Sequence, residues 1–299
     1  MDGNLIELKV WEITGKEAGP TALIAAGTHG NELNGVEVCR KFVEEIEREE
    51  IHGTLLVAPV LNPLAFQMRA RLNPADGRDP SQLYPGTLSG TATEQLVHNI
   101  SEYLVSRAQL VIDLHSGGIG SKNIPHIYVP SKKPTRCEFS CLNLAEAFGG
   151  DLFIDTRPEI DYHFSLTRTL ATYSNEQGAA SFAPELGEGG IVEGDMIRFG
   201  IRGITNVLTK IGILRGTIVP QGRRLITHRS AAVQAPVGGF LRRHYQVGNE
   251  VAKGQHIATI YGIFGGKEEL YSPVAGIVQW TSLFGNVTPG EQILWIGYS

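Results

Sequence analysis

The first two thirds of the chain alternate short apolar runs with amphipathic stretches. Residues 21–26 and 54–60 are short, apolar and rich in β-branched or aliphatic side chains, as buried strands are. Between them, residues 32–50 repeat apolar side chains at helical spacing, which predicts a βαβ unit. The pattern continues with predicted strands at 109–114, 151–154 and 179–186 and predicted helices at 91–108, 140–150 and 190–214. Such alternation predicts an α/β fold, a sheet flanked by helices.

The pattern changes near residue 217. From there to residue 299, short apolar segments are separated by turns at about ten-residue spacing, and no segment has a convincing helical period. This is typical of a small all-β domain. We therefore predict a catalytic domain at 1–216 and an all-β domain at 217–299. The pattern defines the boundary to within about ten residues, the spacing between turns.

Composition narrows the class of protein. Lys and Arg total 26 against 31 Asp and Glu, a net charge of −5, so no overall positive field favours nucleic acid or an anionic membrane. No apolar run reaches the roughly 18 residues of a membrane span, and the N-terminus lacks the features of a signal peptide. Three cysteines are too few for a disulfide framework. We expect a cytoplasmic protein with no nucleic-acid or membrane partner.

Two histidine motifs follow predicted strands. GTHGNE (27–32) places His29 and Glu32 three residues apart where a strand gives way to a helix, and IDLHSGG (112–118) places Asp113 and His115 at the end of another strand. One such histidine alone is usually an ordinary hydrogen-bonded residue. Together, two His and one Glu supply three ligands and leave one position open, as in catalytic zinc sites. Residue types alone do not exclude copper, iron or manganese.

Neighbouring carboxylates suggest further roles. Asp113 is two residues from His115, so both share a face of an extended strand, and a carboxylate can orient a ligating imidazole. Glu185, in FAPELGEGG, follows an apolar strand and could carry protons in a hydrolysis. Glu188 is the rival in the same segment, and a surface role for Glu185 is the plain alternative.

These motifs, taken together with others along the chain, resemble those of a known family. GTHGNE, NPLAFQMRARLNPADG, YPG, DLHSGG and PELGEGG occur in the order expected of the succinylglutamate desuccinylase/aspartoacylase family, within the zinc carboxypeptidase-like superfamily. The resemblance covers roughly residues 20–215. It implies a mixed sheet flanked by helices and a Zn²⁺ ion held by His29, Glu32 and His115. It also implies Glu185 as general base and acid, and Arg71, rather than the nearby Arg69, as the group that polarises the scissile carbonyl.

One departure from the family puts the substrate in question. The family usually carries Asn-Arg before its Phe-Pro-Gly, where the pair grips a substrate carboxylate, but this chain has Ser81 and Gln82 before Tyr84-Pro85-Gly86. A neutral amide cannot replace a bidentate ion pair. We expect Gln82 to contact substrate. Either the substrate has no carboxylate at this point, or another cation such as Arg78 or Arg168 meets that carboxylate from a different direction.

The C-terminal region resembles a lipoyl or biotinyl carrier barrel. The segments APVGGFL, VGNEVAKGQHIATI and SPVAGIVQW fit a hammerhead hairpin module, and Lys267 lies near the turn that carries the modified lysine in such domains, without the usual flanking residues. The overall prediction is a zinc-dependent amidohydrolase, a deacylase that removes an N-acyl group from a small amine or amino-acid derivative. The alternatives are a carboxypeptidase acting on short peptides and a non-catalytic, carrier-like binding protein. A homo-oligomer is possible under all three of these hypotheses.

Overall fold

An eight-stranded mixed sheet organises the first part of the chain. The computed structural model describes residues 6–130, 135–155, 168–223, 225–227 and 229–298. The strand order is β1-β3-β2-β4-β8-β6-β7-β9, parallel except where β1 meets β3 and β6 meets β8. The strands are β1 (Trp11–Thr14), β2 (Glu17–Ala26), β3 (His52–Ala58), β4 (Leu110–Leu114), β6 (His126–Val129), β7 (Leu152–Asp155), β8 (Ala180–Glu185) and β9 (Leu225–Thr227). The mixed α/β fold predicted from the sequence is confirmed.

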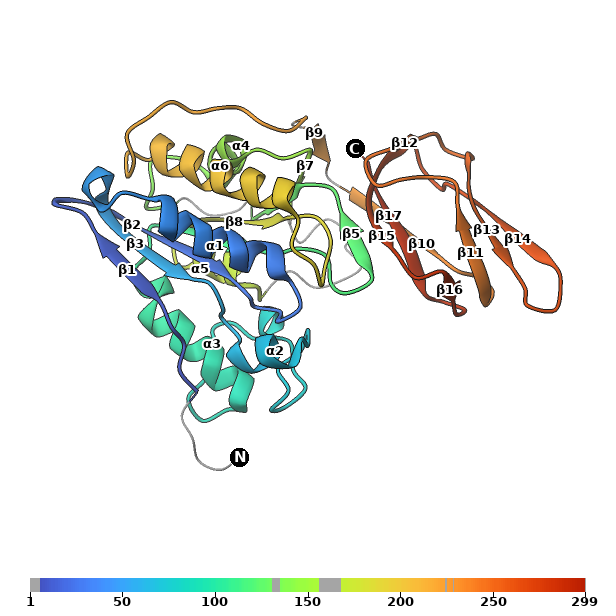
Figure 1. The fold of residues 1–299 in the computed structure, drawn as a ribbon, viewed down its shortest axis with the longest axis horizontal. Helices are drawn as coiled ribbons and strands as arrows, with labels where there is room; N and C mark the ends of the chain where they lie inside the picture. The colour runs from blue at the N-terminus through green and yellow to red at the C-terminus, as the bar shows by residue number, and fades with distance from the viewer. Residues whose placement is uncertain (1–5, 131–134, 156–167, 224, 228, 299) are drawn as a thin grey trace.

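Helices cover both faces of this sheet (Figure 1). They are α1 (Leu33–Glu45), α2 (Pro63–Met68), α3 (Ala92–Tyr103), α4 (Cys141–Phe148), α5 (Leu170–Glu176) and α6 (Gly194–Lys210). Side chains alternate along each strand, so neighbours in β2 enter different cores: Ile24 packs with α1, α4 and α6, whereas Leu23 packs with α3 and α5. Burial of apolar surface on both faces explains why the central strands are almost continuously hydrophobic.

Local signals set several element boundaries. Thr91 and Glu94 form the predicted capping box at the start of α3, with each side chain accepting from the other residue's backbone N–H. Helix α1 is shorter than the predicted 32–50, because Ile46 adopts an extended conformation and ends it. The acidic residues that follow form only a short 3₁₀ turn, η1 (Arg48–Glu50).

The C-terminal region contains two β-sheets and, within the described residues, no helix. One sheet has the order β10-β17-β15-β12 and the other β14-β13-β11-β16; buried residues of both form one core, which includes Val233, Ile257 and Ile296. The strands are β10 (Arg229–Gln234), β11 (Gly239–Arg243), β12 (Glu250–Val251), β13 (His256–Tyr261), β14 (Lys267–Tyr271), β15 (Gly276–Ser282), β16 (Asn286–Val287) and β17 (Gln292–Tyr298). The all-β prediction is confirmed, and closure into a barrel stays a prediction.

The two parts are joined by strand pairing as well as by the chain. Strand β5 (Ser121–Asn123), from the first part, pairs antiparallel with β15 and adds a fifth strand to one C-terminal sheet. Figure 1 shows β5 reaching from the larger lobe towards the smaller one. Strand β9 lies beyond the predicted division at residue 217 yet pairs with β7, so the sheet membership changes only between residues 227 and 229.

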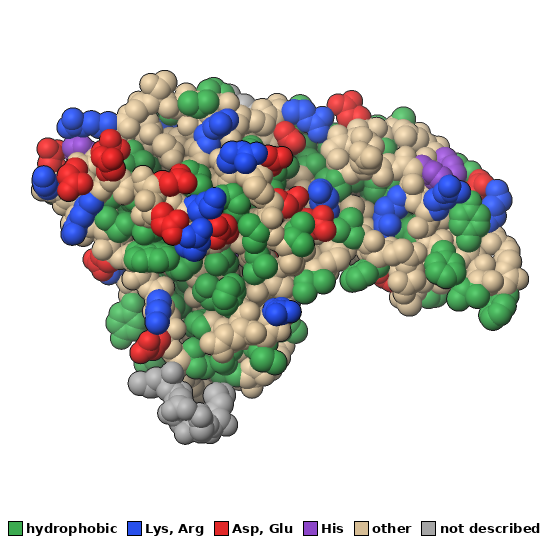
Figure 2. Space-filling model, viewed as in Figure 1, with side chains coloured by type: hydrophobic (Ala, Val, Ile, Leu, Met, Phe, Trp, Pro, Cys, Tyr) green, Lys and Arg blue, Asp and Glu red, His purple; other side chains and the backbone are tan. Residues whose placement is uncertain are grey.

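The surface carries both signs of charge. Figure 2 shows basic and acidic side chains intermixed over the face that bears α1 and α6. That distribution agrees with the near balance of positive and negative residues in the sequence. Among the described residues, no helix is both long and apolar enough to cross a membrane.

Candidate active site

Two strand ends bring the predicted histidines together. Strands β2 and β4 are parallel neighbours in register, with Ala26 opposite Leu114. Their carboxyl ends therefore lie side by side. His115 comes directly after β4, and His29 is the third residue after the end of β2. The two imidazole ring centroids are 5.2 Å apart. Glu32 is the N-cap residue of α1 and closes the turn between β2 and that helix.

Glycines make this turn sterically feasible. Gly27 has a φ of 66°, a left-handed conformation that favours glycine, and a Cβ on Gly30 would lie 2.0 Å from the carbonyl carbon of Ala65. The backbone N–H of Gly30 also donates to the carbonyl oxygen of Ala70 at 2.9 Å. The loop that carries His29 is therefore packed tightly against the segment that follows β3, and its position is well defined.

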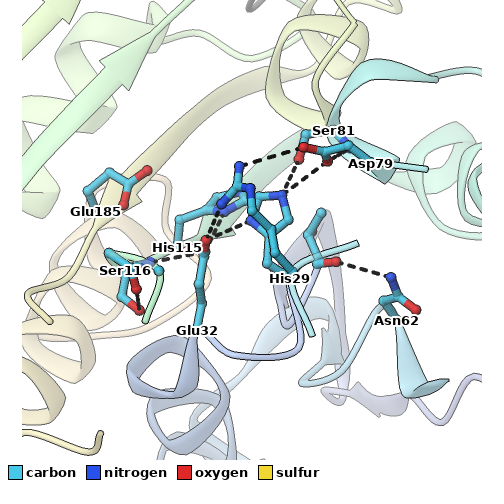
Figure 3. A network of polar contacts seen from close by, with 12 residues as sticks. His29, Glu32, Asn62, Asp79, Ser81, His115, Ser116 and Glu185 are labelled. Carbon is cyan, nitrogen blue, oxygen red and sulfur yellow. Dashed lines mark hydrogen bonds and ion pairs between the residues drawn. The ribbon is translucent and has the colours of Figure 1, made fainter. Parts of the chain in front are cut away.

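His29, Glu32 and His115 form a compact cluster of ligand atoms (Figure 3). Glu32 Oε1 is 2.7 Å from His29 Nδ1, and Glu32 Oε2 is 2.9 Å from His115 Nδ1. One ligand atom from each residue lies within 4.8 Å of the others. His29 and Glu32 are each only 3% exposed, so water weakens the electrostatic interactions among these ligand atoms very little.

The far nitrogen of each imidazole faces a carboxylate. Asp113 Oδ2 is 3.1 Å from His115 Nε2, so the two residues that share a face of the strand are in contact. Asp79 Oδ1 and Ser81 Oγ each lie 3.1 Å from His29 Nε2. When a ring is neutral, an N–H donated from its far nitrogen to the carboxylate leaves Nδ1 with a lone pair directed towards the cluster. Sequence reasoning missed Asp79, whose only local signal is a cap on the short 3₁₀ turn η2 (Pro80–Gln82).

The charges in the cluster depend on one another. Burial alone would raise the pKa of Glu32, but His29 and His115 hold it well below its usual range. Burial alone would lower the pKa of His115, but Asp113 and Glu32 hold it well above its usual range. Burial of Asp79 is likewise outweighed by His29 and Arg71, which lower its pKa to about 2. The carboxyl groups of Glu32 and Asp79 are therefore held in their ionised forms by the cationic groups around them.

Glu185 lies beside the cluster, at the end of β8. The His115 backbone N–H donates to the carbonyl oxygen of Pro184 at 2.8 Å, which fixes Glu185 next to the histidine. Burial, and then the charge of Glu32, raises the pKa of Glu185 to about 8. A carboxyl group in this range can both accept and release a proton near neutral pH. The rival Glu188 instead lies 3.7 Å from Lys122 Nζ, measured at Oε2.

Arg71 reaches the cluster from the loop after α2. Its Nη1 donates to Glu32 Oε1 at 2.9 Å, and its Nη2 lies 3.6 Å from Asp79 Oδ2. The Arg71 side chain is 48% exposed and lines both cavities described below. Arg69, the other candidate in this segment, ends α2 in a left-handed conformation with a φ of 53°. Of the two arginines, Arg71 is therefore the one that contacts the cluster of His29, Glu32 and His115.

Two cavities meet at this cluster. The inner pocket has a volume of about 80 Å³, and the residues that line it alone include Asp79, Ser81, Gln82, Asp113 and His115. The outer cavity has a volume of about 490 Å³ and extends to the C-terminal sheets, where Trp280, Trp295 and Glu291 line it. His29, Arg71, Tyr128 and Glu185 belong to both linings. A bound molecule can therefore pass the cluster with one end in each cavity.

The three predicted substrate contacts lie in different places. Gln82 lines the inner pocket. Arg78 instead pairs with Glu94 at the start of α3, with Nη1 3.1 Å from the carboxylate. The Arg168 guanidinium donates to the backbone carbonyl oxygens of Tyr84, at 3.0 Å, and Leu83, at 3.2 Å. Substrate contact by these residues stays a prediction, and in this structure both arginines are engaged within the protein.

Comparison with known proteins identifies a family whose catalytic domain covers the region that holds this cluster. The model of the succinylglutamate desuccinylase/aspartoacylase catalytic domain matches residues 18–211, which include every residue of the cluster. The chain belongs to this family. Its N-α-acetyl-L-2,4-diaminobutyric acid deacetylase relative from Halomonas elongata is 30% identical over 251 residues, which cover 81% of this chain and 71% of the relative.

Solved structures share the fold over nearly the whole chain. The succinylglutamate desuccinylase/aspartoacylase of Rhodobacter sphaeroides has a TM-score of 0.87 at 27% identity, covering 98% of this chain and 89% of that one. The product-bound ectoine utilization protein EutE of Ruegeria pomeroyi has a TM-score of 0.88 at 24% identity, covering 98% and 90%. The similarity therefore includes the C-terminal sheets as well as the catalytic region.

Proposed function

We propose that this protein is a zinc-dependent amidohydrolase that removes an N-acyl group from a small amine or amino-acid derivative. The observation that carries the proposal is the junction of the two cavities, whose walls together hold a His-Glu-His ligand set, a buried carboxyl group and a guanidinium. His29, Arg71 and Glu185 belong to both linings. This set of groups matches the requirements for attack of water on an amide: a Lewis acid site, a proton carrier and a donor to the carbonyl oxygen.

The donor set fits zinc. Imidazole nitrogens and a carboxylate are ordinary zinc ligands, and three of them leave a position open for catalysis. The orienting carboxylates of Asp79 and Asp113 at the far nitrogens provide the outer-shell partners that ligating histidines usually have. His29, Glu32 and His115 would hold the ion. When bound, zinc acts as a Lewis acid that polarises a carbonyl and makes water easier to deprotonate.

The protein's own residues divide the remaining work. Glu185 accepts a proton from the attacking water as the new C–O bond forms at the carbonyl carbon. Arg71 donates hydrogen bonds to the carbonyl oxygen as negative charge develops there. Glu185 then gives its proton to the nitrogen as the C–N bond breaks, so the products are a carboxylate and a free amine.

The composition of the inner pocket supports a substrate that has no carboxylate bound strongly at Gln82. The residue is an amide, and charge-assisted hydrogen bonds are roughly twice as strong as neutral ones. Among the described residues that line this pocket, Arg71 is the only Lys or Arg, and we assign it to the carbonyl oxygen. The relative from Halomonas elongata supports an N-acetylated diamino acid as one class to test.

The carrier alternative depends on Lys267. In the structure this lysine begins β14, beside the turn 262–266, and its Nζ lies 2.6 Å from Glu269. We propose that the two domains divide between residue 217 and the start of β10 at Arg229, and that the C-terminal domain is an unmodified, lipoyl-like module. Mass spectrometry of the intact protein tests this, because a lipoyl or biotinyl mass on Lys267 would revive the carrier hypothesis. The free cysteines Cys39, Cys137 and Cys141 support the cytoplasm as its location.

A substrate panel tests the proposed function. Purified, zinc-loaded protein is given N-α-acetyl-L-2,4-diaminobutyric acid, other N-acetylated amines, N-acetylaspartate, N-succinylglutamate and short peptides, and the free amine released is measured. We expect turnover of an N-acyl amine or N-acyl diamino acid, with N-acetylaspartate and N-succinylglutamate poor. Cleavage of the peptides alone would indicate the carboxypeptidase alternative. Efficient cleavage of N-acetylaspartate that persists in Arg78→Ala and Arg168→Ala would contradict the reasoning from Gln82.

A further inference from the structure

The buried carboxyl group of Glu185 has a hydrogen-bond donor that the proposed reaction does not yet use. Asn123 Nδ2 donates to Glu185 Oε2 at 3.0 Å. Asn123 is 6% exposed and lines the outer cavity together with Glu185. Its donor is neutral, so it can orient the carboxyl group without adding the positive charge that would make Glu185 a weaker base.

Asn123 belongs to a strand that the C-terminal region supports. It is the last residue of β5, and it stands opposite Trp280 in the pairing of β5 with β15. The next residue, Ile124, donates its backbone N–H to the carbonyl oxygen of Gln279 in β15 at 3.1 Å. On its other side, the Asn123 backbone N–H donates to the carbonyl oxygen of Gly187 at 3.2 Å, two residues after Glu185.

We propose that Asn123 is a positioning residue for Glu185, and that the C-terminal sheet takes part in catalysis by holding β5 in place. The inference rests on the role proposed above for Glu185. An oxygen that accepts the amide N–H is a poorer place for a proton, so Asn123 directs the proton that Glu185 carries to Oε1. The same amide donates to Oε2 whether Glu185 is ionised or protonated. The carboxyl group therefore keeps one orientation while the proton arrives and leaves.

Paired substitutions separate this role from a merely structural one. Asn123→Leu keeps the approximate size and removes the donor, whereas Lys122→Ala changes the same strand at a side chain that faces Glu188 and Glu193 instead. With the best substrate of the panel above, Asn123→Leu should lower kcat by about 10-fold, the value of one hydrogen bond to a charged group, with KM within about twofold. Lys122→Ala should remain within about twofold of the wild type in both constants.

The Glu185→Gln background gives the decisive comparison. If Asn123 acts through Glu185, Asn123→Leu should cost less than about twofold further once Glu185 is replaced, because groups that act as a unit are not additive. A full further loss of about 10-fold would overturn the proposal, as would normal kcat in Asn123→Leu. If Glu185→Gln itself keeps normal turnover, the role proposed for Glu185 fails instead.

Two further measurements require no substrate. Crystal structures of the wild type and Asn123→Leu should show the Glu185 carboxyl group in one orientation in the first and displaced or split in the second; an unchanged side chain would count against the proposal. Hydrogen exchange should show the Ile124 amide to be strongly protected in the intact protein. Exchange as fast as in an exposed loop would refute the part assigned to the C-terminal sheet.

Discussion

The contact between Asp79 and His29 should control how tightly zinc is bound. Asp79→Asn is the useful substitution because asparagine also caps short helices, so the turn at Pro80 should keep its cap from residue 79 to the Ser81 backbone N–H. What is lost is the negative charge 3.1 Å from His29 Nε2. A less basic imidazole is a weaker ligand, and its ring is less firmly oriented.

The structure sets the expected magnitude. Removing an outer-shell partner typically costs 10- to 100-fold in metal affinity, or about 1.4–2.7 kcal/mol. Ser81 Oγ also lies 3.1 Å from His29 Nε2 and can still accept its N–H. We therefore expect Asp79→Asn to weaken zinc binding by about 10-fold, and Asp79→Asn combined with Ser81→Ala to approach 100-fold. Ser81→Ala alone should have the smallest effect, because the charged partner remains.

Competition with a chromophoric chelator at fixed pH measures these affinities without any substrate. Circular dichroism and thermal unfolding of the metal-free proteins serve as the control for folding. Wild-type zinc affinity in the Asp79→Asn, Ser81→Ala double variant would refute the reasoning, since it would show that the far nitrogen of His29 has no influence on the metal.

Three other outcomes follow from the site and its surroundings. His115→Ala should lose most bound zinc in elemental analysis, because three ligands act together, and full occupancy would contradict its assignment. Glu185→Gln should retain zinc but lower turnover by about 100- to 10,000-fold, while Glu188→Gln should remain near wild type in the same assay. Burial lowers the pKa of His126 from 6.5 to about 4, so the folded state resists protonation and stability should fall as the pH drops between those values. Urea unfolding at several pH values should show a shallower decline in His126→Asn, and an unchanged slope would argue against this origin.

Local sequence signals pointed to the His29–Glu32–His115 cluster because each part of it is encoded over a few residues. The glycines around His29 mark a tight turn, and Glu32 follows within the same loop. Asp113 and His115 need only an extended backbone to share a face. The capping box at Thr91 is equally local, which is why the start of α3 was predicted correctly.

The groups that support this set are encoded over long separations. Asp79 lies 50 residues from His29, and Asn123 lies 62 residues from Glu185. In the sequence the first looks like an ordinary helix cap and the second like part of a polar loop. Only the pairing of distant strands gives them partners. Strands β5 and β9 were not predicted for a different reason: each has three residues, too few to show a period of alternation.

The aromatic wall of the outer cavity gives the protein an optical signal of its own. The chain has three tryptophans, and two of them, Trp280 and Trp295, stack with ring centroids 4.8 Å apart and planes inclined by 29°. The third, Trp11, lies in β1 at the outer edge of the large sheet. Two indoles this close share their electronic excitation, so their circular dichroism and fluorescence depend on the space between the lobes. Entry of a molecule into that space should therefore change the circular dichroism and fluorescence of the unlabelled protein, while Trp11, which does not line the outer cavity, contributes a constant background.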